Sequence, residues 1–147
     1  MDDLRFIISD RFQFELSQDD LPFFSERRMI KANPVLLVFK INDRNEEIGF
    51  VEFDVRVVNK NAYMTYFLKK QYRGKGLGRE MVKKAIDFAF NELNLNRITA
   101  EVYEYNTASI KILESLGFIQ EGRLRKAKFH NSRFWDIIVY GLLREDI

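Results

Sequence analysis

Residues 71–78 read Gln71-Tyr72-Arg73-Gly74-Lys75-Gly76-Leu77-Gly78, and this stretch decides the fold because of the segments on either side of it. Residues 63–68 before it form a strand-like run, and residues 77–93 after it show a helical pattern. A glycine-rich turn between a strand and a helix leaves backbone N–H groups unpaired at the positive end of the helix dipole. Such a turn suits a phosphate or pyrophosphate, because side chains would hold the anion away from the amides. We therefore expect a phosphorylated cofactor at this turn.

The charges around the turn also favour an anion, because Arg73, Lys75 and Arg79 flank the glycines. The turn is not a P-loop, since no Ser or Thr follows a Gly-Lys pair at the required place, and Mg²⁺-nucleotide chemistry loses support. It also lacks the final spacing of the dinucleotide fingerprint and that motif's acidic residue on the next strand. The alternative is a glycine-rich helix entrance that binds no ligand.

The composition indicates one domain spanning residues 1–147, with a hydrophobic fraction of 46% that can fill a core. A net charge of only +2 argues against nucleic-acid binding driven by overall charge. The chain has no cysteine and a single histidine, His130, which argues against a metal centre, a disulfide and a cysteine nucleophile. No apolar run reaches membrane-spanning length, and residues 1–5 lack the apolar core of a leader, so we expect a cytosolic protein without membrane contact.

The order of the expected elements indicates a mixed α/β sheet. The 77–93 helix is the best defined, because Leu77, Met81, Ala85 and Ala89 recur every four residues. Hydrophobic periodicity and turn residues predict strands at 12–16, 35–41, 48–57, 63–68, 98–103, from 118 onward and at 134–143; helices from 17 or 19 to 32, at 77–93 and at 107–116 with Gly117 as its C-cap; and turns at 42–45, 59–61 and 131–132.

Two motifs resemble those of a known family. Gln71-x-x-Gly74-x-Gly76 resembles the Q/R-x-x-G-x-G/A signature of the GNAT superfamily of acetyl-CoA-dependent N-acetyltransferases. One helix and one strand later, residues 106–118 resemble that family's N-x-x-S/A-I … L-G-F element. Glu121-Gly122 and Trp135-Asp136 … Tyr140 resemble the ending of the branch that includes ribosomal-protein (RimJ/RimL-type) and polyamine acetyltransferases. The resemblance covers residues 35–143 and implies a GNAT fold, a mixed and mostly antiparallel central sheet flanked by helices, with splayed strands at the cofactor cleft.

The resemblance implies roles for particular residues. The strands at 63–68 and 98–103 would splay apart, and the pantetheine arm would pair with exposed backbone near Phe67 and Leu68. An N–H near Leu68 would stabilise the oxyanion formed when an amine attacks the thioester. Asn106 would bind the cofactor arm while capping its helix, and Ser109 is a weaker candidate of the same kind. The CoA pyrophosphate would be held by the backbone amides of Arg73, Gly74, Lys75, Gly76, Leu77 and Gly78.

The general acid is open. Many family members place a tyrosine seven residues after the asparagine, where it protonates the departing thiolate, and this chain has Leu113 there. Expulsion of a thiolate at pH 7 costs only about 2 kcal/mol, because thiol pKa values lie near 8.5. Water, Tyr103 or Tyr105 are the alternatives, and we take Tyr103 as a candidate catalytic residue.

The general base is open as well. Glu101 lies mid-strand beside the expected cleft and is our choice for a catalytic carboxylate. Glu52 is an alternative, for which a solvated strand carboxylate is the simpler interpretation. His130 is expected to lie exposed and inert in a hairpin turn.

The sequence therefore predicts an N-acetyltransferase that moves acetyl from the co-substrate acetyl-CoA to a primary amine, by direct attack and without a metal. The acceptor is a small-molecule amine or a peptide N-terminus, with a polyamine and an amino sugar among the candidates. The short 18–33 stretch leaves room for an acceptor site completed by a second subunit, so a homodimer is possible. A non-catalytic acyl-CoA sensor on the same fold and a nucleotide-binding module are the alternatives.

Overall fold

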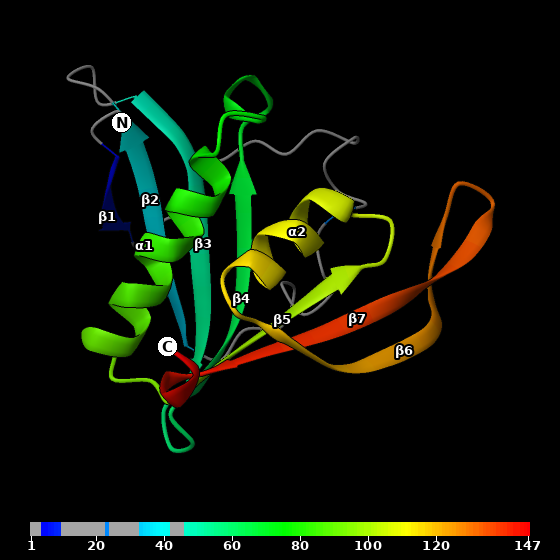
Figure 1. Ribbon diagram of the computed structural model, residues 1–147. Coiled ribbons are helices and arrows are strands. Elements are labelled where there is room, and N and C mark those ends of the chain that lie inside the picture. Colours follow the sequence, from blue (N-terminus) through cyan, green and yellow to red (C-terminus); the bar gives the residue numbers. More distant parts are fainter. Residues whose placement is uncertain (1–3, 10–22, 24–32, 42–45) are drawn as a thin grey trace.

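The computed structural model describes residues 4–9, 23, 33–41 and 46–147. In this part of the chain, seven strands form one sheet in the order β1-β2-β3-β4-β5-β7-β6 (Figure 1). Neighbouring strands are antiparallel except for β4 and β5, which are parallel. The elements are β1 (Arg5–Ser9), β2 (Pro34–Ile41), β3 (Glu46–Arg56), β4 (Asn61–Leu68), the short 3-10 helix η3 (Lys70–Tyr72), α1 (Leu77–Asn91), β5 (Arg97–Tyr103), α2 (Thr107–Ser115), β6 (Ile119–His130), β7 (Arg133–Leu143) and the 3-10 helix η4 (Arg144–Asp146).

Helices α1 and α2 lie on the same face of the sheet (Figure 1). The four-residue repeat of Met81, Ala85 and Ala89 places these side chains on one side of α1, and all three are fully buried. They belong to the main core together with Val51 of β3 and Ile98 of β5. Burial of this apolar stripe is what fixes α1 against the sheet.

The opposite face of the sheet carries a smaller apolar cluster formed by Leu36, Val38, Phe50 and Phe67. Since side chains alternate along a strand, the even-numbered residues of β3 from Phe50 onward point to this face. Glu52, two residues after Phe50, is only 5% exposed, so the expectation of a solvated carboxylate at this position is wrong.

The predicted fold class is confirmed, and most predicted elements agree with the structure to within two residues. Helix α1 ends at Asn91, slightly before the predicted boundary. Gly117 adopts φ 94° directly after α2, the left-handed conformation expected of a helix C-cap glycine. The hairpin turn at 131–132 is also confirmed, because Asn131 and Ser132 have φ values of 51° and 61°.

Three features differ from the expectations. Strand β1 (Arg5–Ser9) was not predicted, while the expected strand at 12–16, the helix reaching residue 32 and the 42–45 turn lie outside the described residues. His130 is the last residue of β6 and pairs with Arg133, so it is not in the turn. Its ring is half-buried and stacks on Tyr105 at a centroid distance of 4.5 Å. The expectation that His130 lies exposed in the hairpin turn is therefore wrong.

No helix in the described part of the chain is long and apolar enough to cross a membrane.

Candidate active site

The site begins where β4 and β5 separate. The two strands pair only through Asn61–Arg97, Ala62–Ile98 and Tyr63–Thr99. After that point β4 continues along β3 as far as Leu68, and β5 continues along β7 as far as Tyr103. Figure 1 shows the two strands diverging toward the side of α2. The predicted splay is therefore present, and along it no other strand of the described residues pairs with the facing edges of β4 and β5.

The phase of β4 decides which backbone groups face this gap. The N–H of Lys69 donates to the carbonyl oxygen of Ile48 at 2.8 Å, which makes this a hydrogen-bonded pair of the β3–β4 ladder. Such pairs recur at every second residue, so Phe67 bonds to β3 while Tyr66 and Leu68 direct their N–H groups to the gap. The backbone of Leu68 thus faces the gap as expected, whereas that of Phe67 faces β3. The ring of Phe67 is buried beside Phe50, with ring centroids 5.9 Å apart.

The turn between β4 and α1 presents a row of backbone donors. Gly74 and Gly76 adopt φ values of 80° and 81°, a left-handed conformation that L side chains rarely tolerate. In the described part of the chain, no backbone hydrogen bond takes up the N–H groups of residues 74–78. A Cβ added at Gly74 or Gly76 would meet no atom within 4 Å, so the space above the turn is open. The turn therefore fits a pyrophosphate.

Arg73 departs from this row. Its own N–H donates to the carbonyl oxygen of Lys70 at 3.2 Å, so its amide is not available to an anion in this conformation. Its guanidinium Nε donates to the carbonyl oxygen of Leu68 at 2.8 Å, and its Cζ lies 5.5 Å from the centre of the Phe67 ring. Arg73 therefore ties the turn to the end of β4. The expected contact of the Arg73 amide with a pyrophosphate is therefore not available in this structure.

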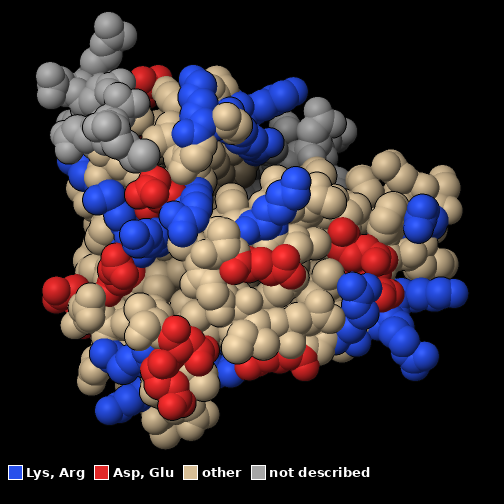
Figure 2. Space-filling model, viewed as in Figure 1, with Lys and Arg blue, Asp and Glu red and all other residues tan. Residues whose placement is uncertain are grey.

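The field around the turn is positive. Exposed Lys70, Arg73, Lys75 and Arg79 surround it, and Figure 2 shows lysine and arginine side chains gathered over this part of the surface. The N-terminus of α1 adds a partial positive charge of its own. Among the described residues, no group of three or more His, Cys, Asp or Glu side chains could hold a metal ion.

Asn106 and Ser109 lie together at the start of α2. The side-chain oxygen of Asn106 accepts the N–H of Ser109 at 3.3 Å and caps the helix. This bond uses the oxygen only, which leaves the side-chain NH₂ of Asn106 to donate to a ligand. The capping role and the expected cofactor role are compatible.

Tyr66 is a site residue that the sequence analysis missed. Its hydroxyl lies 2.5 Å from the Oγ of Ser109 and so connects β4 to α2 across the gap. Burial raises the pKa of Tyr66 to about 12, although the hydrogen bond with Ser109 acts in the opposite direction. A tyrosine shortly before the glycine turn was the available signal in the sequence.

Leu113 has no access to the gap. It is 1% exposed and belongs to the main core. The position that resembles the family's tyrosine therefore holds a packing residue that has no proton to give.

Glu101 and Tyr103 lie on the face of the sheet opposite the helices. Ile98 and Val102 of β5 pack in the core beneath α1, so the residues that alternate with them point the other way. Glu101 is partly exposed there, beyond the last β4–β5 pair. The ring of Tyr103 is 3% exposed and is covered by Lys128, whose Nζ lies 4.7 Å above it. Glu101 is thus beside the gap, as expected, and Tyr103 is enclosed by side chains.

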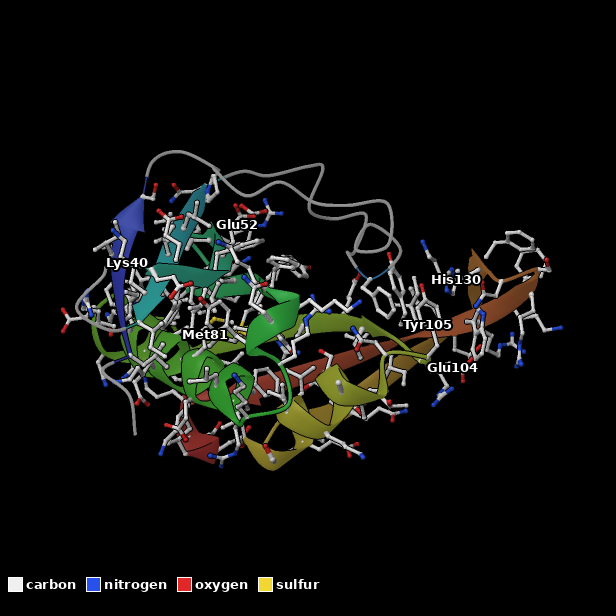
Figure 3. All side chains as sticks on the ribbon, turned by 90° about the horizontal axis from the view of Figure 1, so that it is seen from above. Lys40, Glu52, Met81, Glu104, Tyr105 and His130 are labelled. Carbon is white, nitrogen blue, oxygen red and sulfur yellow. The ribbon has the colours of Figure 1, made fainter. Side chains whose placement is uncertain are left out.

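Tyr105 belongs to an aromatic group at the far end of β5. Its ring stacks on His130 and contacts Trp135 edge-on at 5.3 Å, and Figure 3 shows Tyr105, His130 and Glu104 gathered near the β6–β7 hairpin. Burial raises the pKa of Tyr105 to about 12. Its ring thus has a packing role in this group.

The comparisons with known proteins agree with this geometry. The family model of the acetyltransferase (GNAT) domain matches residues 10–119. The SPbeta prophage-derived N-acetyltransferase YokL of Bacillus subtilis is 32% identical over 140 residues, which cover 93% of this chain and 77% of YokL. The putative ribosomal N-acetyltransferase YdaF of Bacillus subtilis is 34% identical over 89 residues, which cover 60% of this chain and 49% of YdaF.

Solved structures show the same fold. The spermidine N-acetyltransferase from Vibrio cholerae in complex with CoA and spermine has a TM-score of 0.73 and 25% identity, covering 82% of this chain and 71% of that one. The predicted fold and family are therefore confirmed. This chain is a member of the GNAT acetyltransferase domain family.

Proposed function

We propose that this chain transfers the acetyl group of acetyl-CoA to a primary amine of a polyamine. The observation that carries the proposal is that the row of backbone N–H donors lies next to the gap between β4 and β5. The open row of N–H groups at residues 74–78 follows β4 and the short helix η3, at the wide end of the gap between β4 and β5. A diphosphate on the turn and an extended arm along the free edge of β4 would fit this shape.

CoA would be held mostly by backbone. Residues 74–78 would bind its pyrophosphate, the gap-facing backbone of Tyr66 and Leu68 would pair with its arm, and the Asn106 amide would donate to the arm from α2. Bound acetyl-CoA supplies an activated thioester. Direct attack agrees with a sequence that has no cysteine and only one histidine to activate a nucleophile of the enzyme's own.

The acceptor would approach from the face opposite the helices, which carries the three carboxylates of Glu52, Asp54 and Glu101. Glu52 and Asp54 are buried on β3 of this face, and Glu101 lies beside the gap on β5. Asp54 also accepts the N–H of Asn33 at 2.9 Å and pairs with Arg56. Several carboxylates on one face suit a substrate with several ammonium groups, which favours a polyamine.

Glu101 would act as the base. An alkyl ammonium with a pKa near 10.4 costs about 4.6 kcal/mol to neutralise at pH 7, so a carboxylate or a water relayed by one is needed. The N–H of Leu68 would stabilise the negative charge that develops on the carbonyl oxygen. Glu52 is the alternative base, because it shares the face and is buried.

A second acceptor is the N-terminal amine of a ribosomal protein, which the similarity to YdaF favours. An α-amine with a pKa near 7.7 costs only about 1 kcal/mol to neutralise at pH 7, so its transfer depends less on a carboxylate. The two acceptors therefore differ in how strongly they need Glu101.

The test is thiol release from acetyl-CoA with spermidine, spermine, peptide N-termini and amino sugars in parallel. Turnover with the polyamines above all others supports the proposal, and turnover with peptides alone supports the second acceptor. CoA binding without turnover on any amine would mean that the chain is a sensor of acyl-CoA. Competition by ATP, but not by CoA, would indicate a nucleotide-binding module.

A homodimer remains part of the proposal. The Vibrio cholerae enzyme has been solved as a dodecamer, so a protein similar to this chain does assemble. Sedimentation at several protein concentrations tests the state of this chain, and a monomer at all of them would contradict the homodimer.

A further inference from the structure

The hydroxyl of Tyr66 lies beside the gap between β4 and β5, into which the proposed function places the thioester of acetyl-CoA. Tyr66 lies three residues beyond Tyr63, the last residue of β4 that pairs with β5. Its hydroxyl reaches the first turn of α2 and meets Ser109 Oγ at 2.5 Å. The group thus spans the gap on the side of the helices, while Glu101 lies on the opposite face of the sheet.

The other side chains considered for the leaving group lie elsewhere. Leu113 is buried and has no polar hydrogen, and Tyr103 is enclosed beneath Lys128 on the face of Glu101. Tyr105 is stacked against His130 at the end of the hairpin. Tyr66 is the tyrosine of the described β4–α2 region that reaches the gap from the helix side.

We propose that the Tyr66 hydroxyl donates a hydrogen bond to the departing CoA sulfur, and that Ser109 holds the phenol in place for it. This inference rests on the proposed function. The amine nitrogen forms its bond to the carbonyl carbon and gives its proton to the base, while the C–S bond breaks and sulfur leaves with the electron pair. Tyr66 keeps its hydrogen throughout, and the thiolate later takes a proton from water.

The order of the pKa values explains why Tyr66 donates a hydrogen bond and does not lose its proton. Burial raises the pKa of Tyr66 to about 12, whereas a thiol has a pKa near 8.5. The phenol therefore stays protonated beside a thiolate. Ser109 can donate to the phenolic oxygen, which frees the phenolic hydrogen for sulfur and strengthens it as a donor.

The first test is Tyr66→Phe, compared with Ser109→Ala. Both variants remove the hydrogen bond between the two side chains, but only the first removes the donor to sulfur. We expect Tyr66→Phe to lower kcat about 10- to 100-fold, the range of a hydrogen bond to a charged group, with little change in the KM for acetyl-CoA. Ser109→Ala keeps the donor to sulfur but loses the contact that orients it, so we expect a smaller fall in kcat, about 3- to 10-fold.

The double variant Tyr66→Phe, Ser109→Ala guards against a folding effect. The double variant contains neither hydroxyl. If the fall in kcat of Tyr66→Phe came from an unpaired Ser109 hydroxyl, kcat would therefore recover in the double variant. A loss caused by the missing donor would persist. Recovery of kcat in the double variant would overturn the inference.

A second readout does not depend on turnover. Ultraviolet absorbance of the thiolate reports the pKa of the CoA thiol when CoA is bound. A donor beside sulfur should lower this pKa by about one unit from its free value, and Tyr66→Phe should abolish the shift. An unshifted thiol in the wild type, or an equal shift in the variant, would overturn the inference. If no amine were acetylated and the shift were present, the proposed function would fail while the contact of Tyr66 with sulfur would stand.

Discussion

A Cβ atom added to Gly49 of β3 would stand 2.2 Å from the carbonyl oxygen of Phe67 in β4. Real Cβ atoms do not approach an oxygen so closely, and this oxygen belongs to backbone that cannot rotate away. The close approach sets the position of β4 at the residues where its other edge faces the gap. Gly49 therefore supports the site although it lies outside the gap.

Gly49→Ala should push β4 away from β3. We expect a loss of about 2–3 kcal/mol in the free energy of unfolding, the upper part of the range for overpacking a core. Affinity for CoA should fall as well, because displacement of Phe67 also moves Leu68, whose backbone is proposed to pair with the CoA arm. Urea unfolding and calorimetry measure the two effects, and a stable variant with normal CoA affinity would show that β4 does not depend on this contact.

Gly76→Ala tests the turn itself. An L residue held at φ 81° costs about 1–2 kcal/mol, and relief of that strain would rotate the N–H groups of the row. We expect CoA affinity to fall about fivefold or more. Gly122→Ala is the matched control, since a Cβ there also meets no atom within 4 Å but the backbone is not left-handed. Equal CoA affinity in the two variants would contradict the assignment of the row.

Glu101→Gln should slow turnover about 100-fold or more with a polyamine and leave CoA affinity unchanged, because the amide cannot accept the proton of the amine. Glu52→Gln is the comparison on the same face. A loss of turnover in Glu52→Gln alone would transfer the role of base to Glu52. Steady-state kinetics below pH 8 measure both variants.

Asp136 predicts a pH dependence of stability. The pKa of Asp136 is lowered because Arg123 hydrogen-bonds its carboxylate at 2.7 Å, and the N–H of Lys126 adds a second bond. A lowered folded-state pKa means that this stabilisation is complete above the unfolded pKa, 3.8, and is lost as pH falls through the folded value. Asp136→Asn should therefore flatten the fall in Tm below about pH 5. Arg123→Gln should flatten the fall in Tm in the same way, and combining the two substitutions should have no additional effect. A fall in Tm at low pH as steep as that of the wild type in both variants would contradict the pairing.

Most of the fold could be predicted from the sequence because the strongest patterns in the sequence are local. The period of α1 and the glycines at 74 and 76 each need only neighbouring residues to be read. Strand β1 was missed because it is only five residues long and shows no alternation of buried and exposed side chains. Its adjacent residues Ile7 and Ile8 are both exposed. His130 was misplaced by one residue, because a two-residue turn keeps it inside the ladder.

The site was predicted less completely for two reasons. It depends on which backbone groups of β4 face the gap, and it depends on contacts between residues far apart in the sequence. Whether Phe67 or Leu68 faces the gap follows from the pairing of Lys69 with Ile48, which no local pattern reveals. The contact of Tyr66 with Ser109 joins residues 43 positions apart. Such contacts arise from the packing of α2 over the gap and have no signature in either segment alone.

Calorimetric titration with CoA, in the presence and absence of ATP, tests the donor row at residues 74–78 most directly. We expect saturable one-site binding that ATP does not displace and that Gly76→Ala weakens while Gly122→Ala does not. A titration without heat of binding, or full displacement by ATP, would contradict the assignment of this turn to CoA.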